Sequence, residues 1–297
     1  MKSHTNELLA LQPHHAFFVG IDSDGCVFPT MEIKQKRCFH PELIRQWGLE
    51  SVAAAVREVA GFVSLNSVHR GRNRFPSLLL TFELLRDHPE VRAAGAAARL
   101  PACEALRGFV NSGRPLGNDE LQRLVDRTGD PELRAVLEWS KAVNARIERE
   151  ANAIAPYPSA VEALGKIQAC ADSMVVSQTP TATLVREWER HGLRERVRFI
   201  AGQEYGTKTE QMRLATQNRF PPARLLLIGD APADREAVEA LGGLFYPILP
   251  GDESTSWRRF CAEALARFLN GSFTGAYARA LDCAFRACLP ESPPWKR

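Results

Sequence analysis

The chain has 297 residues, of which 45% are hydrophobic and 25% are charged, and this is ordinary usage for a folded protein large enough for two domains. Its formal net charge of +3 comes from 38 basic and 35 acidic residues, too slight an excess to favour nucleic acid or an anionic membrane as a partner. No apolar run approaches the roughly 20 residues that span a bilayer, so we expect no membrane partner either.

The first predicted element is a short buried strand over residues 16–21. Its sequence, Ala-Phe-Phe-Val-Gly-Ile, is apolar, too brief for a helix and rich in β-favouring residues. Asp22 and Asp24 follow directly, and Gly25 allows the chain to turn away. In open α/β sheets, ligands lie outside the carboxyl ends of the strands. Two carboxylates there can bind a cation or act as a nucleophile, although Asp and Gly are also common in an ordinary turn.

A long helical segment follows, from about residue 39 to residue 155, without a convincing strand. Residues 41–48 open with proline and close with glycine, which is a favourable frame for a helix. We expect residues 35–155 to form a helical domain inserted into an α/β core made of residues 1–34 and 156–250. The other predicted helices of the insert are 52–64, 75–85, 101–110, 119–128 and 131–151.

Polar and cationic residues gather between two of these helices, in residues 66–75. Arginine side chains bind phosphate or carboxylate through paired N–H donors, and loops often carry function. Arg70, Arg72, Asn73 and Arg74 are therefore candidate substrate-binding residues. In that case the substrate has a second anionic or polyhydroxylated group. The alternative is a solvated loop between helices.

Residues 157–250 alternate between helix and strand, which is typical of parallel βαβ units. Helices are predicted over 158–171, 181–191, 207–218 and 233–241. Strands are predicted over 173–177, 197–201, 224–228 and 244–249. The expected fold class is therefore α/β, with a Rossmann-like parallel sheet core, a helical domain inserted after the first strand and a helical C-terminal extension.

The C-terminal extension is predicted over residues 251–297, because apolar residues recur there at helical spacing between Trp257 and Cys288. We expect two amphipathic helices that pack on the core. A dimer contact or a wall of the substrate entrance is the alternative, and the protein is expected to be a monomer or a homodimer.

Further polar residues follow the later strands. Ser177 ends one strand, Lys208 begins a helical pattern, and Asp230 ends another strand, with Asp234 four residues on. Together with the first acidic pair, the order and spacing of these pieces resemble the haloacid dehalogenase (HAD) superfamily of phosphohydrolases, in particular its phosphoglycolate-phosphatase-like members. The resemblance covers residues 16–34 and about 157–250, and the helical insert resembles the C1-type cap of that superfamily.

The resemblance implies a role for each acidic residue. Asp22 is implied as the nucleophile, and Asp24 as the general acid and base. A magnesium ion is implied as cofactor, with ligands from Asp22, Asp230 and the backbone carbonyl of Asp24, and with Asp234 in support. Asp234 could equally be an acid in the first turn of a helix, stabilised by the helix dipole.

Three more residues are implied to bind the phosphoryl group. They are the Ser177 hydroxyl, the backbone N–H of Gln178 and the Lys208 ammonium group. A serine at a strand end is otherwise a common turn or capping residue, and a lysine at a helix start is usually solvated. Many relatives have proline after the lysine where this chain has Thr209, which weakens that assignment.

The implied function is a magnesium-dependent phosphatase acting on a small phosphorylated metabolite of the phosphoglycolate or sugar-phosphate type. Relatives that cleave carbon–halogen or carbon–phosphorus bonds lack an acid at the position of Asp24, so this residue favours phosphoester chemistry. A phosphomutase would share the same residues. A non-catalytic binding protein on this fold is the third possibility.

Seven cysteines are odd in number and scattered, with neither a disulfide framework nor a metal-binding spacing. The first seven residues lack the organisation of a signal peptide. These two observations favour a cytoplasmic protein.

Overall fold

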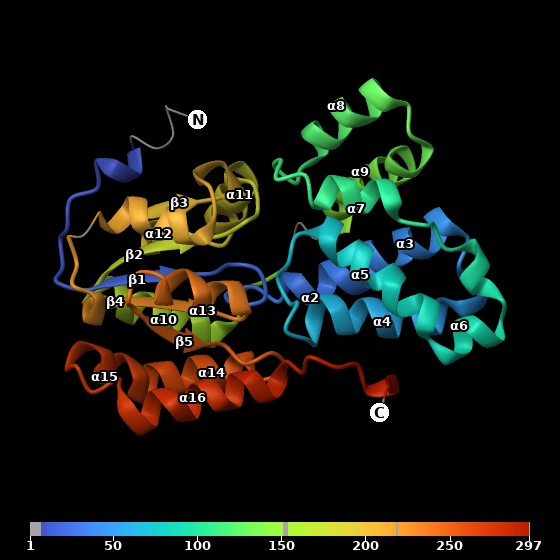
Figure 1. Cartoon of the computed structure of the whole chain (residues 1–297). Coiled ribbons are helices and arrows are strands. Elements are labelled where there is room, and N and C mark those ends of the chain that lie inside the picture. Colours follow the sequence, from blue (N-terminus) through green and yellow to red (C-terminus); the bar gives the residue numbers. More distant parts are fainter. Residues whose placement is uncertain (1–6, 151–153, 218, 297) are drawn as a thin grey trace. The chain divides into compact units, whose positions relative to one another are not determined.

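The computed structural model describes residues 7–150, 154–217 and 219–296, and these ranges divide into two compact units. The first unit is formed by residues 1–30 and 154–288, within those limits, and the second by residues 31–153 and 289–297 (Figure 1). The first contains the whole sheet and the second is helical. None of the described helices is both long and apolar enough to cross a membrane.

The sheet of the first unit has five parallel strands in the order β3-β2-β1-β4-β5 (Figure 1). β1 lies at its centre, with Phe18 in register with Asp172 on one side and with Leu225 on the other. The strands are β1 Phe18–Ile21, β2 Asp172–Val176, β3 Phe199–Ala201, β4 Leu225–Gly229 and β5 Leu244–Pro247. The predicted α/β class with a Rossmann-like parallel sheet is confirmed.

Helices cover both faces of the sheet, which is why its central strands are continuous apolar runs. Val19 and Ile21 face a core that includes α10, α11 and the C-terminal helices α14 and α15. Phe18 lies in the other core, with α12 and α13. The bounds of these helices are α10 Pro158–Gln168, α11 Thr181–Arg190, α12 Lys208–Thr216, α13 Pro232–Glu239, α14 Glu253–Arg259 and α15 Leu265–Leu269.

The second unit has its own hydrophobic core. Its first helix is longer than predicted, because α2 (Thr30–Lys34) continues through a π-helical turn at Gln35–Phe39 into α3 (His40–Trp47). Gly48 ends this helix in the left-handed conformation, as its place in the sequence predicted. The other helices of the unit are α4 Ala53–Leu65, α5 Arg74–Asp87, α6 Pro89–Ala93, α7 Glu104–Val110, α8 Asn118–Thr128 and α9 Pro131–Glu150.

The C-terminal extension is divided between the two units. Residues up to Cys288, including α16 (Gly275–Cys288), group with the first unit. Leu289 and the described residues after it group with the helical unit, where the Trp295 ring lies 5.5 Å from Phe62 and 5.3 Å from His88. The extension that we expected over 251–297 is therefore not one piece packed on the core.

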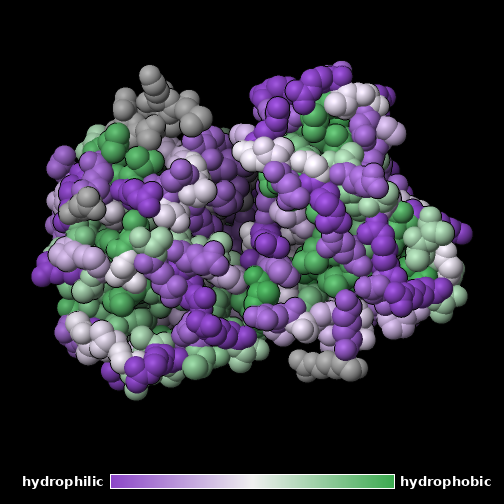
Figure 2. Space-filling model, viewed as in Figure 1, coloured by the Kyte–Doolittle hydropathy of each residue, from purple (hydrophilic) through white to green (hydrophobic). Residues whose placement is uncertain are grey.

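Large hydrophobic side chains are rarely exposed in the described part of the chain. Leu9, at 40% exposure, is the one large hydrophobic residue classed as exposed in the described part of the chain. Figure 2 shows polar and apolar residues interspersed on the face in view.

Candidate active site

The site lies at the carboxyl edge of the three central strands. Asp22 follows β1, Ser177 follows β2 and Asp230 follows β4, and these strands are direct neighbours in the sheet. The backbone N–H of Asp22 extends the pairing by donating to the Ile228 carbonyl at 2.9 Å. The parallel topology thus brings together residues that are more than 200 positions apart in the sequence.

The loop after β1 is fixed by its own backbone. The Ser23 carbonyl accepts the N–H groups of Val27 at 3.0 Å and Phe28 at 3.1 Å. Gly25 has a φ of +83°, a left-handed conformation that glycine adopts without strain, and its N–H donates to the Phe28 carbonyl at 2.8 Å. The predicted turn at Gly25 therefore exists and orients the residues on either side of it.

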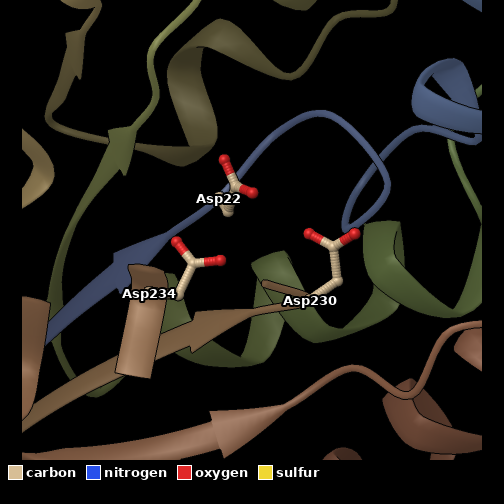
Figure 3. A group of neighbouring side chains, drawn as sticks. All are labelled: Asp22, Asp230 and Asp234. Carbon is tan, nitrogen blue, oxygen red and sulfur yellow. The ribbon is translucent and has the colours of Figure 1, made fainter. Parts of the chain in front are cut away.

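Three carboxylates converge in this site. Asp22, Asp230 and Asp234 each place an oxygen within 4.8 Å of the others, and all three are buried. Figure 3 shows the three side chains directed toward a common space, from the ends of β1 and β4 and from the first turn of α13. Three buried acids so close together need a cation, because like charges repel strongly away from water.

Lys208 supplies a positive charge from the first position of α12. Its Nζ lies 3.1 Å from Asp22 Oδ1 and 2.6 Å from Asp234 Oδ1. Burial works to lower the pKa of Lys208, but Asp22 and Asp234 outweigh it and raise this pKa above its usual value. Lys208 is therefore charged, and the structure brings it against two of the acidic residues that the sequence singled out.

A single lysine does not compensate for three acids. Burial raises the pKa of the Asp22 carboxyl well above its usual value, Lys208 opposes this shift, and Asp234 and Asp230 raise the pKa further. The pKa of Asp234 is also raised, first by burial. The site without a metal ion therefore disfavours full ionisation of its carboxylates.

The two oxygens of Asp22 differ. Oδ1 accepts the backbone N–H of Ser23 at 2.8 Å and faces Lys208. Oδ2 accepts no hydrogen bond from any residue in the described ranges, so it is available to a ligand.

Asp234, by contrast, uses both of its oxygens within the protein. Oδ1 faces Lys208, and Oδ2 accepts the Ala231 N–H at 3.0 Å. Asp234 lies in the first turn of α13, and it also belongs to the acidic cluster. Gly229 makes room for it, because a Cβ there would lie 2.3 Å from Asp234 Cγ.

Asp24 is held by two threonine hydroxyls. Thr179 Oγ1 donates to its Oδ2 at 2.7 Å, and Thr30 Oγ1 donates to its Oδ1. Thr179 comes from the loop after β2, so that loop and the loop after β1 are joined through this carboxylate. The sequence did not identify either threonine, because hydroxyl residues at such positions are common in any turn.

Ser177 and Gln178 lie beside this pair. Ser177 Oγ accepts the Thr179 N–H at 3.1 Å, and the backbone N–H of Gln178 has no hydrogen-bond partner within the described ranges. The end of β2 therefore carries a hydroxyl group and an open N–H, two groups that can bind an anionic oxygen.

Gln211 lies beside the site and was not among the residues predicted from the sequence. It is fully buried, its Oε1 accepts the Ser177 N–H at 3.1 Å, and its Nε2 donates to the Ser177 carbonyl at 2.8 Å. Nε2 also donates to the carbonyls of Gly202 and Gly206 at 3.0 Å each. One amide on α12 thus fixes the end of β2 and the loop that leads to Lys208.

Two buried tryptophans hold the loop after β1 from outside. The Trp188 indole N–H donates to Ser23 Oγ at 3.0 Å. The Trp257 indole N–H donates to the Cys26 carbonyl at 2.9 Å. Trp257 belongs to α14, so the C-terminal helices contribute directly to this loop.

In the helical unit, the four candidate substrate-binding residues have four different environments. Arg70 is buried and donates to the Leu65 carbonyl at 2.9 Å. Arg72 is exposed. Asn73 caps α5 by accepting the Phe75 N–H at 3.0 Å. Arg74 is half-buried and bonds to α9. The structure therefore does not present them as one convergent cluster.

Comparisons with known proteins bear on the fold. No protein-family model and no curated protein matches the sequence. A haloacid dehalogenase-like family hydrolase from Streptococcus pneumoniae matches with a TM-score of 0.51 at 14% identity, over 85% of this chain and 98% of that one. A haloacid dehalogenase-like family hydrolase from Xanthomonas campestris matches with a TM-score of 0.46 at 14% identity, over 89% and 96% of the two chains. The chain therefore has the fold of haloacid dehalogenase-like hydrolases.

Proposed function

We propose that the protein is a magnesium-dependent phosphatase that hydrolyses a small phosphorylated metabolite of the phosphoglycolate or sugar-phosphate type. The observation that carries this proposal is the convergence of Asp22, Asp230 and Asp234 around Lys208 at the carboxyl edge of the sheet. Asp24, in the adjoining loop, favours phosphoester chemistry over dehalogenation.

The residues of the site fit a magnesium ion. Magnesium prefers hard oxygen ligands, and the donors here are buried carboxylates, of which Asp22 and Asp234 have raised pKa values when no metal is present. Asp22, Asp230 and the backbone carbonyl of Asp24 would hold the ion, with Asp234 supporting it through Lys208. When bound, magnesium supplies positive charge for the phosphoryl oxygens.

The chain's own residues then divide the reaction between them. Asp22 Oδ2 attacks phosphorus and forms an aspartyl-phosphate, while Asp24 gives a proton to the leaving oxygen of the substrate. Asp24 then takes a proton from water as that water attacks the same phosphorus, which releases phosphate and restores Asp22. Lys208, the Ser177 hydroxyl and the Gln178 N–H bind the phosphoryl oxygens in both steps.

Removal of divalent metal should abolish phosphate release, because a dianionic phosphate cannot approach the acidic cluster without further positive charge. The measurement is phosphate release from a panel of phosphometabolites in magnesium, in excess EDTA and after magnesium is restored.

Calcium should inhibit, since its larger and looser coordination would misplace Asp22. Full activity in EDTA would contradict the proposal. Transfer of phosphate to a second hydroxyl of the substrate, without release, would assign a phosphomutase.

Replacing Asp24 with asparagine should lower kcat by about 10²–10⁴-fold, the usual worth of a general acid. The loss should be smaller for a substrate with a good leaving group, such as p-nitrophenyl phosphate, because its leaving oxygen needs no proton. Asp252→Asn is the matched control, since Asp252 is an exposed acid in the same unit. Equal losses on both substrates would assign Asp24 a role other than proton donation.

A further inference from the structure

Arg74 has an unusual set of partners. It is the first residue of α5, and its Nη1 donates to three oxygens of α9. These are the Ser140 carbonyl at 3.1 Å, Ser140 Oγ at 2.9 Å and Asn144 Oδ1 at 2.7 Å. All three acceptors are neutral, so they fix the guanidinium group without balancing its charge.

No carboxylate within the described ranges forms an ion pair with Arg74. Burial lowers the pKa of Arg74 to about 10, and no nearby acid opposes this shift. The group therefore remains charged at neutral pH. Arg146, two residues after Asn144 in α9, differs from Arg74 because carboxylates balance its charge. It forms ion pairs with Glu42 at 3.3 Å and with Glu150 at 2.8 Å.

The plane of the Arg74 guanidinium is fixed as well. It lies over the Phe39 ring at 5.1 Å, and Phe39 packs edge-on against Trp139 at 5.9 Å. Ser140 Oγ donates its own proton to Asn118 Oδ1 at 2.6 Å, so its lone pairs face Arg74. Residues from the π-helical turn and from α5, α8 and α9 thus hold one side chain in one orientation.

This arrangement leaves one edge of the guanidinium open. Nη1 is used by α9, whereas Nε and Nη2 have no hydrogen-bond partner in the part of the chain that the structure describes. Nε and Nη2 form the edge that binds a carboxylate or a phosphate group through two parallel hydrogen bonds. Asn144 is exposed beside it, and its amide oxygen is occupied by Arg74, so its NH₂ group is available as a further donor.

We propose that Arg74 is the centre of an oxyanion-binding site in the helical unit, which takes a carboxylate or phosphate group of a small ligand on its Nε and Nη2, with the Asn144 amide as an additional donor. The site uses residues of the helical unit only, and the inference does not depend on the proposed hydrolysis.

The test is a titration of the full-length, magnesium-free protein, followed through the side-chain Nε–H signals of its arginines by NMR. The Arg74 signal is identified by its absence in Arg74→Lys. Malonate is the carboxylate probe and methyl phosphate the phosphate probe, each at constant ionic strength against sodium chloride. We expect a saturable shift of the Arg74 signal with one or both oxyanions and none with chloride. The probe that saturates at the lower concentration names the ligand group.

Variants separate this site from the acidic cluster. Arg74→Lys keeps the charge but loses the paired donors, and it should weaken binding of the preferred probe by about 10-fold or more in calorimetry. Asn144→Ala should weaken it less. Arg134→Lys, at an exposed arginine of α9, should leave it unchanged. An Arg74 signal that does not move with either oxyanion, or that moves equally with chloride, would overturn the proposal. Unchanged affinity in a folded Arg74→Lys protein would do the same.

Discussion

Asp22→Asn should lower turnover by about 10⁴-fold or more and leave the fold intact. The amide cannot attack phosphorus, and removal of a nucleophile from an enzyme costs losses of this order. The amide keeps the shape of the carboxylate, so its oxygen can still accept the Ser23 N–H. The measurement is single-turnover phosphate release together with circular dichroism.

The same change should also stabilise the metal-free protein near neutral pH. A carboxyl group whose pKa is higher in the folded than in the unfolded protein binds its proton more tightly when folded. Stability therefore falls as the pH rises from the unfolded pKa, near 4, through the raised pKa of Asp22. Asparagine cannot ionise, so Asp22→Asn removes this loss.

Thermal unfolding in EDTA at pH 5 and pH 8 measures the effect. The difference in Tm between variant and wild type should be larger at pH 8. Asp252→Asn, in an exposed position, should show no such dependence. If Asp22→Asn released phosphate at a rate near that of the wild type, Asp22 would not be the nucleophile.

Lys208→Met should destabilise the protein by about 3–5 kcal/mol and abolish turnover. It leaves Asp22 and Asp234 buried without the ammonium group that faces both of them, and the loss of one partner from a buried ion pair has this cost. The rate falls because the phosphoryl group loses a positive charge as well. Chemical denaturation in EDTA measures the stability change.

Lys166→Met is the matched control for this prediction. Lys166 forms an exposed pair with Glu162 in the same unit, so its loss should leave the free energy of unfolding nearly unchanged. The double variant Lys208→Met/Asp234→Asn should recover part of the lost stability, because it removes one of the two uncompensated charges. If the free energy of unfolding of Lys208→Met equalled that of the wild type, the Lys208 ammonium group would not be stabilising the acidic cluster.

The parallel sheet was predictable because its central strands are buried on both faces. Such strands appear in the sequence as short apolar segments bounded by polar or turn-forming residues. The acidic residues were predictable for a related reason, since the residue after each such strand reaches the same edge of the sheet. The pattern could not show side chains whose role depends on a partner far away in the sequence. Gln211 has no distinguishing feature in the sequence, and its role appears only in the structure, where its amide hydrogen-bonds to the backbone at the end of β2.

The start of the helical unit was missed for a local reason. Residues 31–37 are rich in charged and long polar side chains, and the π-helical turn at Gln35–Phe39 shifts the apolar positions out of a regular helical period. The composition of residues 70–74 suggested one anion-binding surface. In the structure, Arg70 donates to the Leu65 carbonyl and Asn73 caps α5, and a residue count along the chain does not reveal such local partners.

The bond from Trp257 to the loop after β1 has a consequence for the chain during its synthesis. It joins residues separated by 231 positions, which a ribosome adds in about 12–46 s at 5–20 residues per second. The helical segment 31–153 emerges within that interval, before the strands β2 and β4 that pair with β1. A nascent chain that has just passed Asp234 already contains every candidate catalytic residue, yet the loop that carries Asp22 and Asp24 still lacks the indole that holds it.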